Sequence, residues 1–404
     1  MINRSFINKI SVLFVLMLMS KSMFSQEQNK DQFDYQKVLD YCIDKSLHTV
    51  SSFNDNDKFP RYIETDATHW ESDKVENWIS GFWPGILWYS FEASNNLALK
   101  QSAALYTQKQ QVVMDKPIRS HDLGFMLYCS YGNGYRLTKN SAYKTLLLSA
   151  ADSLATLYNP TVGTILSWPS KRKNNNWPHH TIIDNMMNLE LLFWAAKNGG
   201  AKNLYNIAVK HAETTMKHHI RTDNTTYHVV FYNDKNGDFI KGKTHQGYTD
   251  DSLWARGQAW GIYGFTMCYR ETGKVEFMET AIKLADAYIK NLPNDLIPYW
   301  DFNDPSIPNT PRDASAAAVV ASALLELSSL NTDALISEKY KGIAIKMLQS
   351  LSSDMYLSKD KNNAFLLHST GNKPKNREVD VSIIYADYYY IEALLLLKKI
   401  SLKG

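Results

Sequence analysis

The sequence predicts an all-α protein: an (α/α)6 barrel, a toroid of six helical hairpins, with a small β-hairpin in one loop. Apolar residues recur at helical spacing in twelve segments. The connections between these segments alternate between short and long, and short connections make neighbouring helices antiparallel. Six such pairs, with the long loops gathered at one end, close into a ring. An α-solenoid is the alternative, but it would repeat a residue signature at a fixed period, which we do not find.

Turn-forming residues separate the two helices of each predicted pair. The twelve helices are expected at residues 32–52, 79–92, 96–115, 119–136, 140–158, 181–198, 202–220, 251–271, 275–292, 312–329, 334–352 and 377–399. Short turns such as Asn95-Asn96, Gly199-Gly200 and Thr272-Gly273 end the even-numbered helices. Long connections precede these helices, except the fourth, which follows the short turn 117–120. Because no linker interrupts the alternation, we expect residues 26–404 to form a single domain.

One long connection contains a strand pattern. Residues 227–232 are rich in β-branched and aromatic side chains, and Asn236-Gly237 is a strong hairpin-turn signal before residues 238–240. We therefore expect a β-hairpin before the eighth helix.

The N-terminus has the pattern of a secretory signal peptide. Basic residues precede an apolar run from Ile10 to Met19, and small residues follow it up to Ser25. Ten apolar residues are too few to span a bilayer as a helix. We expect residues 1–25 to be removed and the protein to be exported, either to the periplasm or into the medium, as a monomer.

Removal of this segment changes the charge of the chain. The full sequence has 44 Lys and Arg against 41 Asp and Glu, and the segment contains three bases and no acid. The remaining chain is therefore neutral, which argues against nucleic acid and membrane partners. Three widely spaced cysteines, Cys42, Cys129 and Cys268, indicate buried thiols rather than disulfides. No spacing of His, Cys or acidic residues indicates a metal site.

Two carboxylates lie near the starts of even-numbered helices, at the end with the long loops. They are Asp122, in Ser-His-Asp-Leu-Gly (120–124), and Asp184, in Asp-Asn-Met-Met-Asn (184–188). An acid at such a position usually stabilises the helix end, and Thr181 with Asp184 resembles a capping box. However, Asp184 has apolar neighbours that are expected to face inward. Two carboxylates across a pocket are the minimal equipment for glycosidic chemistry.

A third group of residues surrounds the start of the eighth helix. Arg256 lies in its first turns, where a cation is unfavourable without an anionic partner, and Trp260 lies four residues later on the same face. A structural Arg–carboxylate pair and a substrate contact explain Arg256 about equally well. Trp78, Trp168 and other tryptophans near the long loops would suit the apolar faces of sugar rings.

Together these motifs resemble the unsaturated glucuronyl hydrolases, glycoside hydrolase family 88. The matching segments are 120–124, 184–188, Trp-Ala-Arg-Gly-Gln-Ala-Trp (254–260) and 385–394, and the resemblance covers nearly the whole chain after the signal peptide. It implies an (α/α)6 barrel without a cofactor or metal. It also implies hydrolysis of the Δ4,5-unsaturated uronic acid that polysaccharide lyases leave at the non-reducing end of oligosaccharides.

The resemblance also implies roles for individual residues. Asp184 resembles the general acid and base of the family, and Asp122 its second essential carboxylate. Substrate-binding roles follow for His121, Trp168, His228, Gln246, Arg256 and Trp260. We expect residues 368–374 to contact the next sugar.

Three questions stay open from the sequence. The unsaturated rhamnogalacturonyl hydrolases have the same barrel and reaction with a pectin-derived substrate. An exported, non-catalytic glycan-binding protein would share the aromatic, neutral composition. The polysaccharide that supplies the substrate is also undetermined, with ulvan and the glycosaminoglycans as the candidates.

Overall fold

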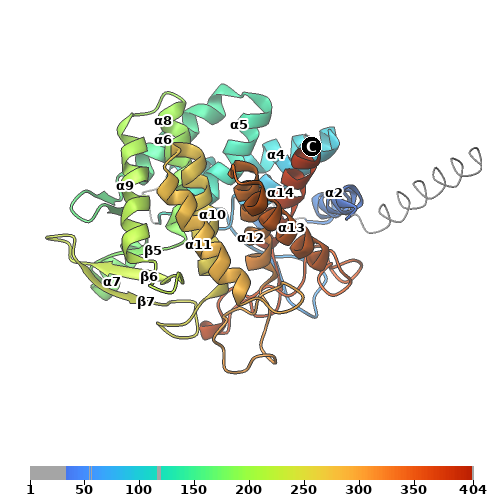
Figure 1. The fold of residues 1–404 in the computed structure, drawn as a ribbon. Coiled ribbons are helices and arrows are strands. Elements are labelled where there is room, and N and C mark those ends of the chain that lie inside the picture. Colours follow the sequence, from blue (N-terminus) through green and yellow to red (C-terminus); the bar gives the residue numbers. More distant parts are fainter. Residues whose placement is uncertain (1–32, 54, 56, 116–119, 403–404) are drawn as a thin grey trace, which may run out of the picture.

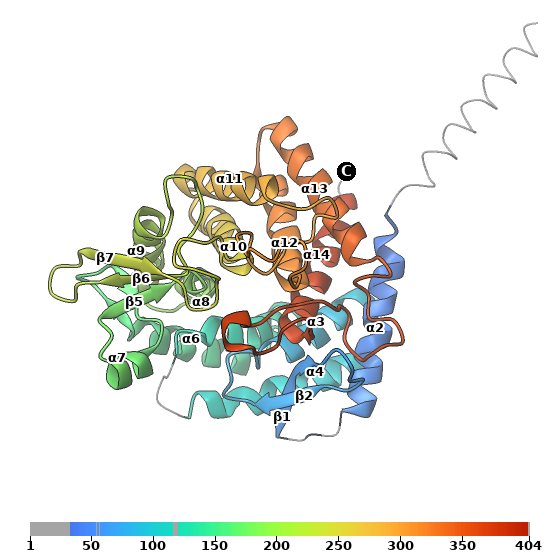
Figure 2. The ribbon, with the colours of Figure 1, turned by 90° about the horizontal axis from the view of Figure 1, so that it is seen from below.

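The computed structural model describes residues 33–53, 55, 57–115 and 120–402. The predicted signal peptide lies outside these residues. The described chain forms two concentric rings of helices (Figures 1 and 2). The inner ring comprises α3 (Phe82–Ser94), η2 (Gly124–Gly132) continued by α5 (Asn133–Thr138), α8 (Asn185–Lys197), α10 (Ala255–Thr272), α12 (Ala314–Leu330) and α14 (Ile384–Ser401). The outer ring comprises α2 (Tyr35–Ser52), α4 (Leu97–Lys109), α6 (Ser141–Ala155), α9 (Asn203–His218), α11 (Val275–Lys290) and α13 (Ala334–Leu351).

The inner helices pack side by side in chain order, and α14 packs on α3 to close the ring. Their composition explains their place: α12, for example, is rich in Ala, Val and Leu and is buried on all sides from Ala314 to Leu325. The outer helices bury one stripe only. In α11 the buried residues include Phe277, Ala281 and Leu284, at the spacing of one helix face. The twelve helices and the predicted (α/α)6 barrel are thereby confirmed.

Short irregular elements complete the fold. They are the 3-10 turns η1 (Gln110–Val113) and η3 (Lys373–Lys375), helix α7 (Pro169–Asn175), and strands β1 (Lys58–Ile63), β2 (Glu71–Lys74), β3 (Tyr158–Asn159), β4 (Thr164–Ile165), β5 (His179–Ile182), β6 (Val229–Tyr232), β7 (Phe239–Lys243) and β8 (Ser382–Ile383). The predicted hairpin is confirmed, since β6 and β7 pair antiparallel with Val229 opposite Lys243. Strand β5 adds a third member by pairing with β6.

Two predicted helix starts are wrong because the residues expected to begin these helices form β-strands instead. The sixth helix begins at Asn185 rather than 181, since Thr181 and Ile182 pair with Val230 and Val229. The last helix begins at Ile384 rather than 377, since Ser382 and Ile383 pair with strand β1. The fourth helix also differs, because its first nine residues are π-helical.

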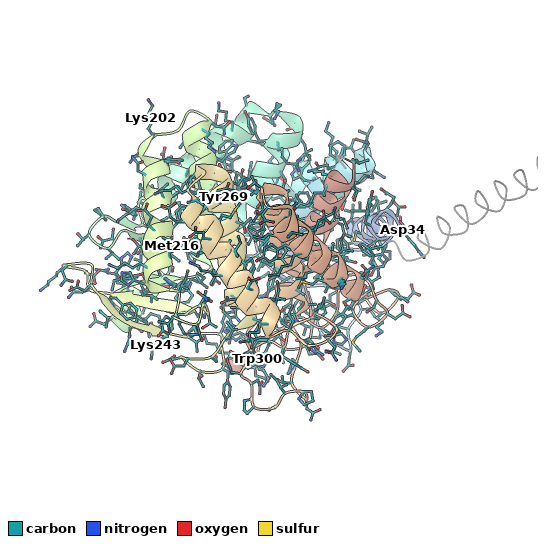
Figure 3. The ribbon with its side chains drawn as sticks, in the orientation of Figure 1. Asp34, Lys202, Met216, Lys243, Tyr269 and Trp300 are labelled. Atoms are coloured by element: carbon teal, nitrogen blue, oxygen red, sulfur yellow. The ribbon has the colours of Figure 1, made fainter. Side chains whose placement is uncertain are left out.

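The two ends of the barrel are unlike. The long connections and strands β5, β6 and β7 are gathered at the lower end in Figure 1, and Figure 2, which looks onto this end, also shows β1 and β2. Trp300 and Lys243 mark it in Figure 3, while Tyr269 and Lys202 lie toward the opposite end. Each inner helix starts at the long-loop end. The three cysteines are buried and free, as expected. Among the described residues, no helix is both long and apolar enough to cross a membrane.

Candidate active site

The starts of four inner helices bring charged side chains together at the long-loop end. Asp122 lies two residues before η2, Asp184 directly before α8, and Asp313 directly before α12. Arg256 is the second residue of α10. The ring closes these four starts around one axis, so residues far apart in the sequence share one site.

Asp184 is a nearly buried carboxylic acid without a structural partner. Its side chain is 15% exposed, and Oδ1 has no hydrogen-bond partner among the described residues. It makes no capping bond to α8, and Thr181 belongs to β5, so the capping-box interpretation is wrong. Burial, and next the charge of Asp122, raise the pKa of Asp184 to about 7, while Arg256 opposes the shift. Asp184 can therefore hold a proton near neutral pH.

His228 faces Asp184 with a defined tautomer. Its Nδ1 accepts the backbone N–H groups of His245, at 3.1 Å, and Gln246, at 3.2 Å. A neutral ring therefore has its proton on Nε2, which lies 3.7 Å from Oδ1 of Asp184. Burial lowers the pKa of His228 well below its ordinary value, so the ring is neutral. The Nε2–H group has no other partner among the described residues and is directed at the catalytic candidate.

Asp122 sits beside a second buried histidine. The Nε2 atom of His121 lies 3.4 Å from Oδ1 of Asp122, and Ser120 donates to Oδ2. Burial lowers the pKa of His121, and the charge of Asp122 opposes this shift. The Asp122 side chain is 12% exposed, so it remains accessible to a small group.

A glycine and an asparagine hold the two carboxylate-bearing segments together. The Oδ1 atom of Asn188 on α8 accepts the backbone N–H of Phe125 in η2 at 3.0 Å. A Cβ atom at Gly124 would lie only 2.6 Å from Cα of Asn188, so any larger residue would push the helices apart. This close approach sets the spacing of Asp122 and Asp184.

Arg256 has the structural pair that the sequence left as one of two explanations. It is 2% exposed, forms an ion pair with the fully buried Asp313, and lies between the rings of Trp254 and Tyr385. It also donates to the carbonyls of Thr370 and Gly371. The substrate contact of Arg256 stays a prediction.

Gln246 reaches the same loop as Arg256. Its Nε2 group donates to the carbonyl of Gly371 at 3.0 Å. The segment 368–374 therefore joins the site, and Lys373 is anchored by Asp304 at 3.4 Å and by the Trp300 ring.

Trp168 and two lysines form the outer wall. The Trp168 ring lies 6.3 Å from His228 and 5.2 Å from His245, between centroids. Lys171 Nζ lies 4.7 Å from the Trp168 ring and 3.3 Å from Nε2 of His245, and Lys375 Nζ lies 3.0 Å from the same nitrogen. Neither lysine forms an ion pair with a described carboxylate. The two ammonium groups therefore gather at one ring with no counter-charge in the described part of the chain.

An aromatic layer lies beneath the site. Trp260 packs against Phe125 at 5.4 Å and Tyr389 at 5.6 Å, and Trp78 packs against Phe125 at 5.5 Å. Trp260 is 1% exposed, and its Nε1–H has no partner among the described residues. Such an enclosed ring supports the floor of the site, and the stacking on substrate that we predicted for Trp260 stays untested.

All eight predicted site residues thus gather at one end of the barrel. The sequence reasoning missed Asp313, Lys171, Lys375 and His245. Asp313 follows Pro311 at a helix start, a signal for a cap but not for an ion pair with Arg256. Lys171 lies in a basic triplet between Trp168 and Trp177, a pattern that is more often a solvated loop than a contact to an anionic glycan.

Comparison with known proteins places this arrangement in a family. The model of Glycosyl Hydrolase Family 88 matches residues 46–395. A relative from Formosa agariphila named unsaturated glucuronyl hydrolase is 43% identical over 374 residues, covering 91% of this chain and 89% of the relative. An unsaturated chondroitin disaccharide hydrolase from Streptococcus pyogenes is 33% identical, covering 92% and 93% of the two chains.

Solved structures agree in fold. The crystal structure of an unsaturated glucuronyl hydrolase specific for heparin is 40% identical, with a TM-score of 0.86 over 91% of this chain and 98% of that one. The unsaturated glucuronyl hydrolase from Bacillus sp. GL1, described as responsible for glycosaminoglycan degradation, is 30% identical, with a TM-score of 0.85 over 90% and 97%.

Proposed function

The chain belongs to glycoside hydrolase family 88, and from this premise we propose that Asp184 and Asp122 carry out its reaction at the long-loop end. The enzyme removes the non-reducing Δ4,5-unsaturated uronic acid from oligosaccharides that polysaccharide lyases release. The relatives named as unsaturated glucuronyl or chondroitin disaccharide hydrolases support this activity. The observation that carries our assignment is the buried Asp184 carboxyl, whose pKa near 7 provides a proton donor at neutral pH.

The proposed chemistry follows from the bonding of the substrate. The unsaturated ring is a vinyl ether, with the ring oxygen on C5 of the C4=C5 double bond. Protonated Asp184 transfers its proton to C4, and the ring oxygen stabilises the cation that forms at C5. The resulting carboxylate then accepts a proton as water adds to C5. The C5 hemiketal opens to a ketone, and the hemiacetal released at C1 collapses to an aldehyde and frees the remaining saccharide.

The neighbouring groups assist these two roles of Asp184. The negative charge of Asp122 helps to retain the proton before the reaction. The Nε2–H group of His228 lies 3.7 Å from Asp184 and favours the carboxylate after the proton has left. His121, Trp168, Gln246, Arg256 and Trp260 are proposed to bind and orient the uronate. No step requires a cofactor.

Replacement of Asp184 by Asn tests the assignment. General acid–base catalysis contributes about 10²–10⁴-fold, so Asp184→Asn should slow turnover by at least about 100-fold. Turnover is followed by the loss of ultraviolet absorbance from the conjugated double bond of a lyase-generated disaccharide. Folding should be retained, because the side chain makes no capping bond.

A true capping aspartate provides the matched control. Asp333 caps α13 through the N–H groups of Leu335 and Ile336. Asp333→Ala should lower the free energy of unfolding by about 1 kcal/mol and leave the rate unchanged. If Asp184→Asn instead melts early with full activity, the assignment is wrong.

The acidic or sulfated character of the substrate can be tested at the outer wall. We propose that Lys171 and Lys375, which lack a described carboxylate partner, favour an anionic group on the sugar next to the uronate. Sulfated and unsulfated disaccharides from ulvan, chondroitin and heparin form the test panel. Lys375→Ala should raise KM for the sulfated members only. An equal effect on unsulfated members contradicts the proposal.

We also propose that the enzyme is exported to the periplasm or the medium and works as a monomer. The basic, apolar and small-residue order of residues 1–25 supports export. The intact mass of protein recovered from the periplasm or the medium should correspond to a chain starting near residue 26. A full-length mass in the cytoplasm contradicts export, and a dimer in size-exclusion chromatography contradicts the monomer.

The two alternatives remain experimentally separable from this function. A rhamnogalacturonyl hydrolase would convert pectin-derived unsaturated disaccharides and leave the panel above unchanged. A glycan-binding protein would bind the disaccharides without loss of absorbance.

A further inference from the structure

A cavity lies inside the ring of inner helices and extends from Phe125 and Met187 to the end of the barrel opposite the long loops. It has a volume of about 410 Å³, and every inner helix contributes to its wall. The contributing residues include Tyr89 of α3, Asn133 of α5, Trp194 of α8, Arg270 of α10, Glu326 of α12 and Glu392 of α14. Arg270 adjoins Tyr269, which lies toward the end away from Trp300 in Figure 3. The volume falls within the range of about 300–1,000 Å³ that is usual for small-ligand sites.

Most of the charged groups around this cavity are paired. Arg270 forms ion pairs with Glu190, Glu326, at 2.5 Å, and Glu271, at 2.9 Å. Lys197 compensates Glu271 at 2.6 Å. Burial raises the pKa of Glu190 to about 7, and the charge of Arg270 opposes this shift, so the cluster has little net charge near neutral pH. Arg136 and Lys399, which also line the cavity, share Glu92, and Lys139 forms no ion pair with a described carboxylate. The wall therefore offers both hydrogen-bond donors and acceptors.

Aromatic rings line the rest of the wall. Trp194 is half-buried and packs edge-on against Tyr135, with centroids 5.5 Å apart, and near Tyr128 at 6.2 Å. Tyr389 also lines the cavity and is 2% exposed, yet its hydroxyl has no hydrogen-bond partner among the described residues. The hydroxyl is not fully buried, so it can donate to or accept from a group inside the cavity.

Residues of the aromatic layer form part of the cavity wall. Phe125 and Tyr389 line the cavity, and Trp260 packs against both of them. Gly124 and Met187, two and three residues after Asp122 and Asp184, line the cavity, but the two acids themselves do not.

We infer that this cavity is a second carbohydrate site, which binds one neutral sugar ring. The apolar C–H face of a sugar suits the Trp194 ring, and its hydroxyl groups suit the paired carboxylates, the Arg270 guanidinium and the Tyr389 hydroxyl. The compensated charges around Arg270 favour a neutral ring beside it over a charged uronate. The inference itself uses no catalytic role; only its test rests on the proposed function, because an unsaturated disaccharide blocks the catalytic end.

Calorimetric titration with neutral sugars tests the site. D-Glucose, D-galactose, L-rhamnose and N-acetyl-D-galactosamine are titrated into the Asp184→Asn protein whose catalytic end is first saturated with an unsaturated disaccharide. At least one of the four should bind with one site per chain. Tyr389→Phe, which removes only the unpaired hydroxyl, should weaken that binding at least fivefold, and Trp194→Ala should abolish it.

A tryptophan at the other end of the barrel is the matched control. Trp70 is half-buried near β2, and Trp70→Ala should leave sugar binding unchanged. Trp194→Ala should also leave turnover of the disaccharide unchanged, because Trp194 lies outside the catalytic end. If none of the four sugars binds, or if binding is the same in Tyr389→Phe as in the parent protein, the cavity is not a sugar site.

Discussion

Burial, rather than a strong local charge, gives Asp184 its chemistry. The acid lies where an ordinary aspartate would cap a helix, but its oxygens face the site and one of them lacks a partner. The apolar neighbours of Asp184 indicated this orientation from the sequence. The role of Arg256 could not be decided in the same way, because its partner Asp313 lies 57 residues away and joins it only when the ring closes.

The raised pKa of Asp184 predicts how activity depends on pH. The proton donor is lost as the pH rises through about 7, so kcat/KM should fall on the alkaline side with a midpoint near this value. A steady-state pH profile with the lyase-generated disaccharide measures it. A profile that stays flat to pH 9 would contradict Asp184 as the acid.

The same shift predicts how stability depends on pH. The folded carboxyl titrates near 7 and the unfolded one near about 4, so the folded state binds the extra proton. The stabilisation from this proton is complete below about pH 4 and is lost as the pH rises through 7. Asp184→Asn removes the buried charge, so it should raise the free energy of unfolding by up to about 4 kcal/mol at pH 8. At pH 4 the gain should be much smaller, as urea denaturation at both pH values would show.

At the scale of the elements, hydrophobic periodicity located all twelve helices, but it could not locate their starts. Short strands compete for the same residues: β5 takes Thr181 and Ile182, and β8 takes Ser382 and Ile383. Their partners lie about 50 and 320 residues away along the chain, so a local pattern gives no signal for the pairing. The hairpin β6–β7 was predictable because its turn is local.

Replacing glycine by alanine should have opposite effects on stability at Gly124, which lies at the contact between η2 and α8, and at Gly342, which lies in α13. Gly124→Ala places a Cβ atom 2.6 Å from Cα of Asn188, so we expect both destabilisation by about 1–3 kcal/mol and loss of activity. Gly342 lies inside α13, where nothing would meet an added Cβ within 4 Å. Gly342→Ala should stabilise the protein by up to about 1 kcal/mol at unchanged activity. Urea denaturation measures both, and equal effects would contradict the role of Gly124.

Arg256 of α10 links Asp313, at the start of α12, to the segment 368–374, and this link can be tested by substitution. Asp313→Asn leaves the Arg256 guanidinium buried without its ion partner, which should destabilise the protein by about 3–5 kcal/mol. The carbonyls that Arg256 holds belong to Thr370 and Gly371, so this segment should become sensitive to protease before the rest of the chain. Limited proteolysis with mass spectrometry identifies the first cleavage site. A first cleavage outside residues 368–374 would contradict the proposed role of Arg256 in holding this segment.

At the scale of the whole molecule, the alternation of loop lengths was the decisive signal. It placed all long connections at one end and so predicted where the site would lie, before any side chain was located. It could not predict how the loops bind one another, since contacts such as Gln246 to Gly371 join connections 125 residues apart.

The site also predicts that turnover is independent of metal ions. Among the described residues, no group of three or more His, Cys, Asp or Glu side chains is placed to hold a metal ion. Dialysis against EDTA should leave the rate of absorbance loss within error of the untreated enzyme. A rate that falls with EDTA and returns with a divalent cation would contradict the proposed proton transfer from Asp184 alone.

All inner helices start at the catalytic end, so they are parallel to one another. Each helix carries a macrodipole with about half a positive charge at its N-terminus. Six parallel macrodipoles therefore give the catalytic mouth a positive potential that the residue count does not reveal. After removal of residues 1–25 the chain would have equal numbers of acidic and basic residues, yet its backbone would still attract a uronate toward one end of the barrel.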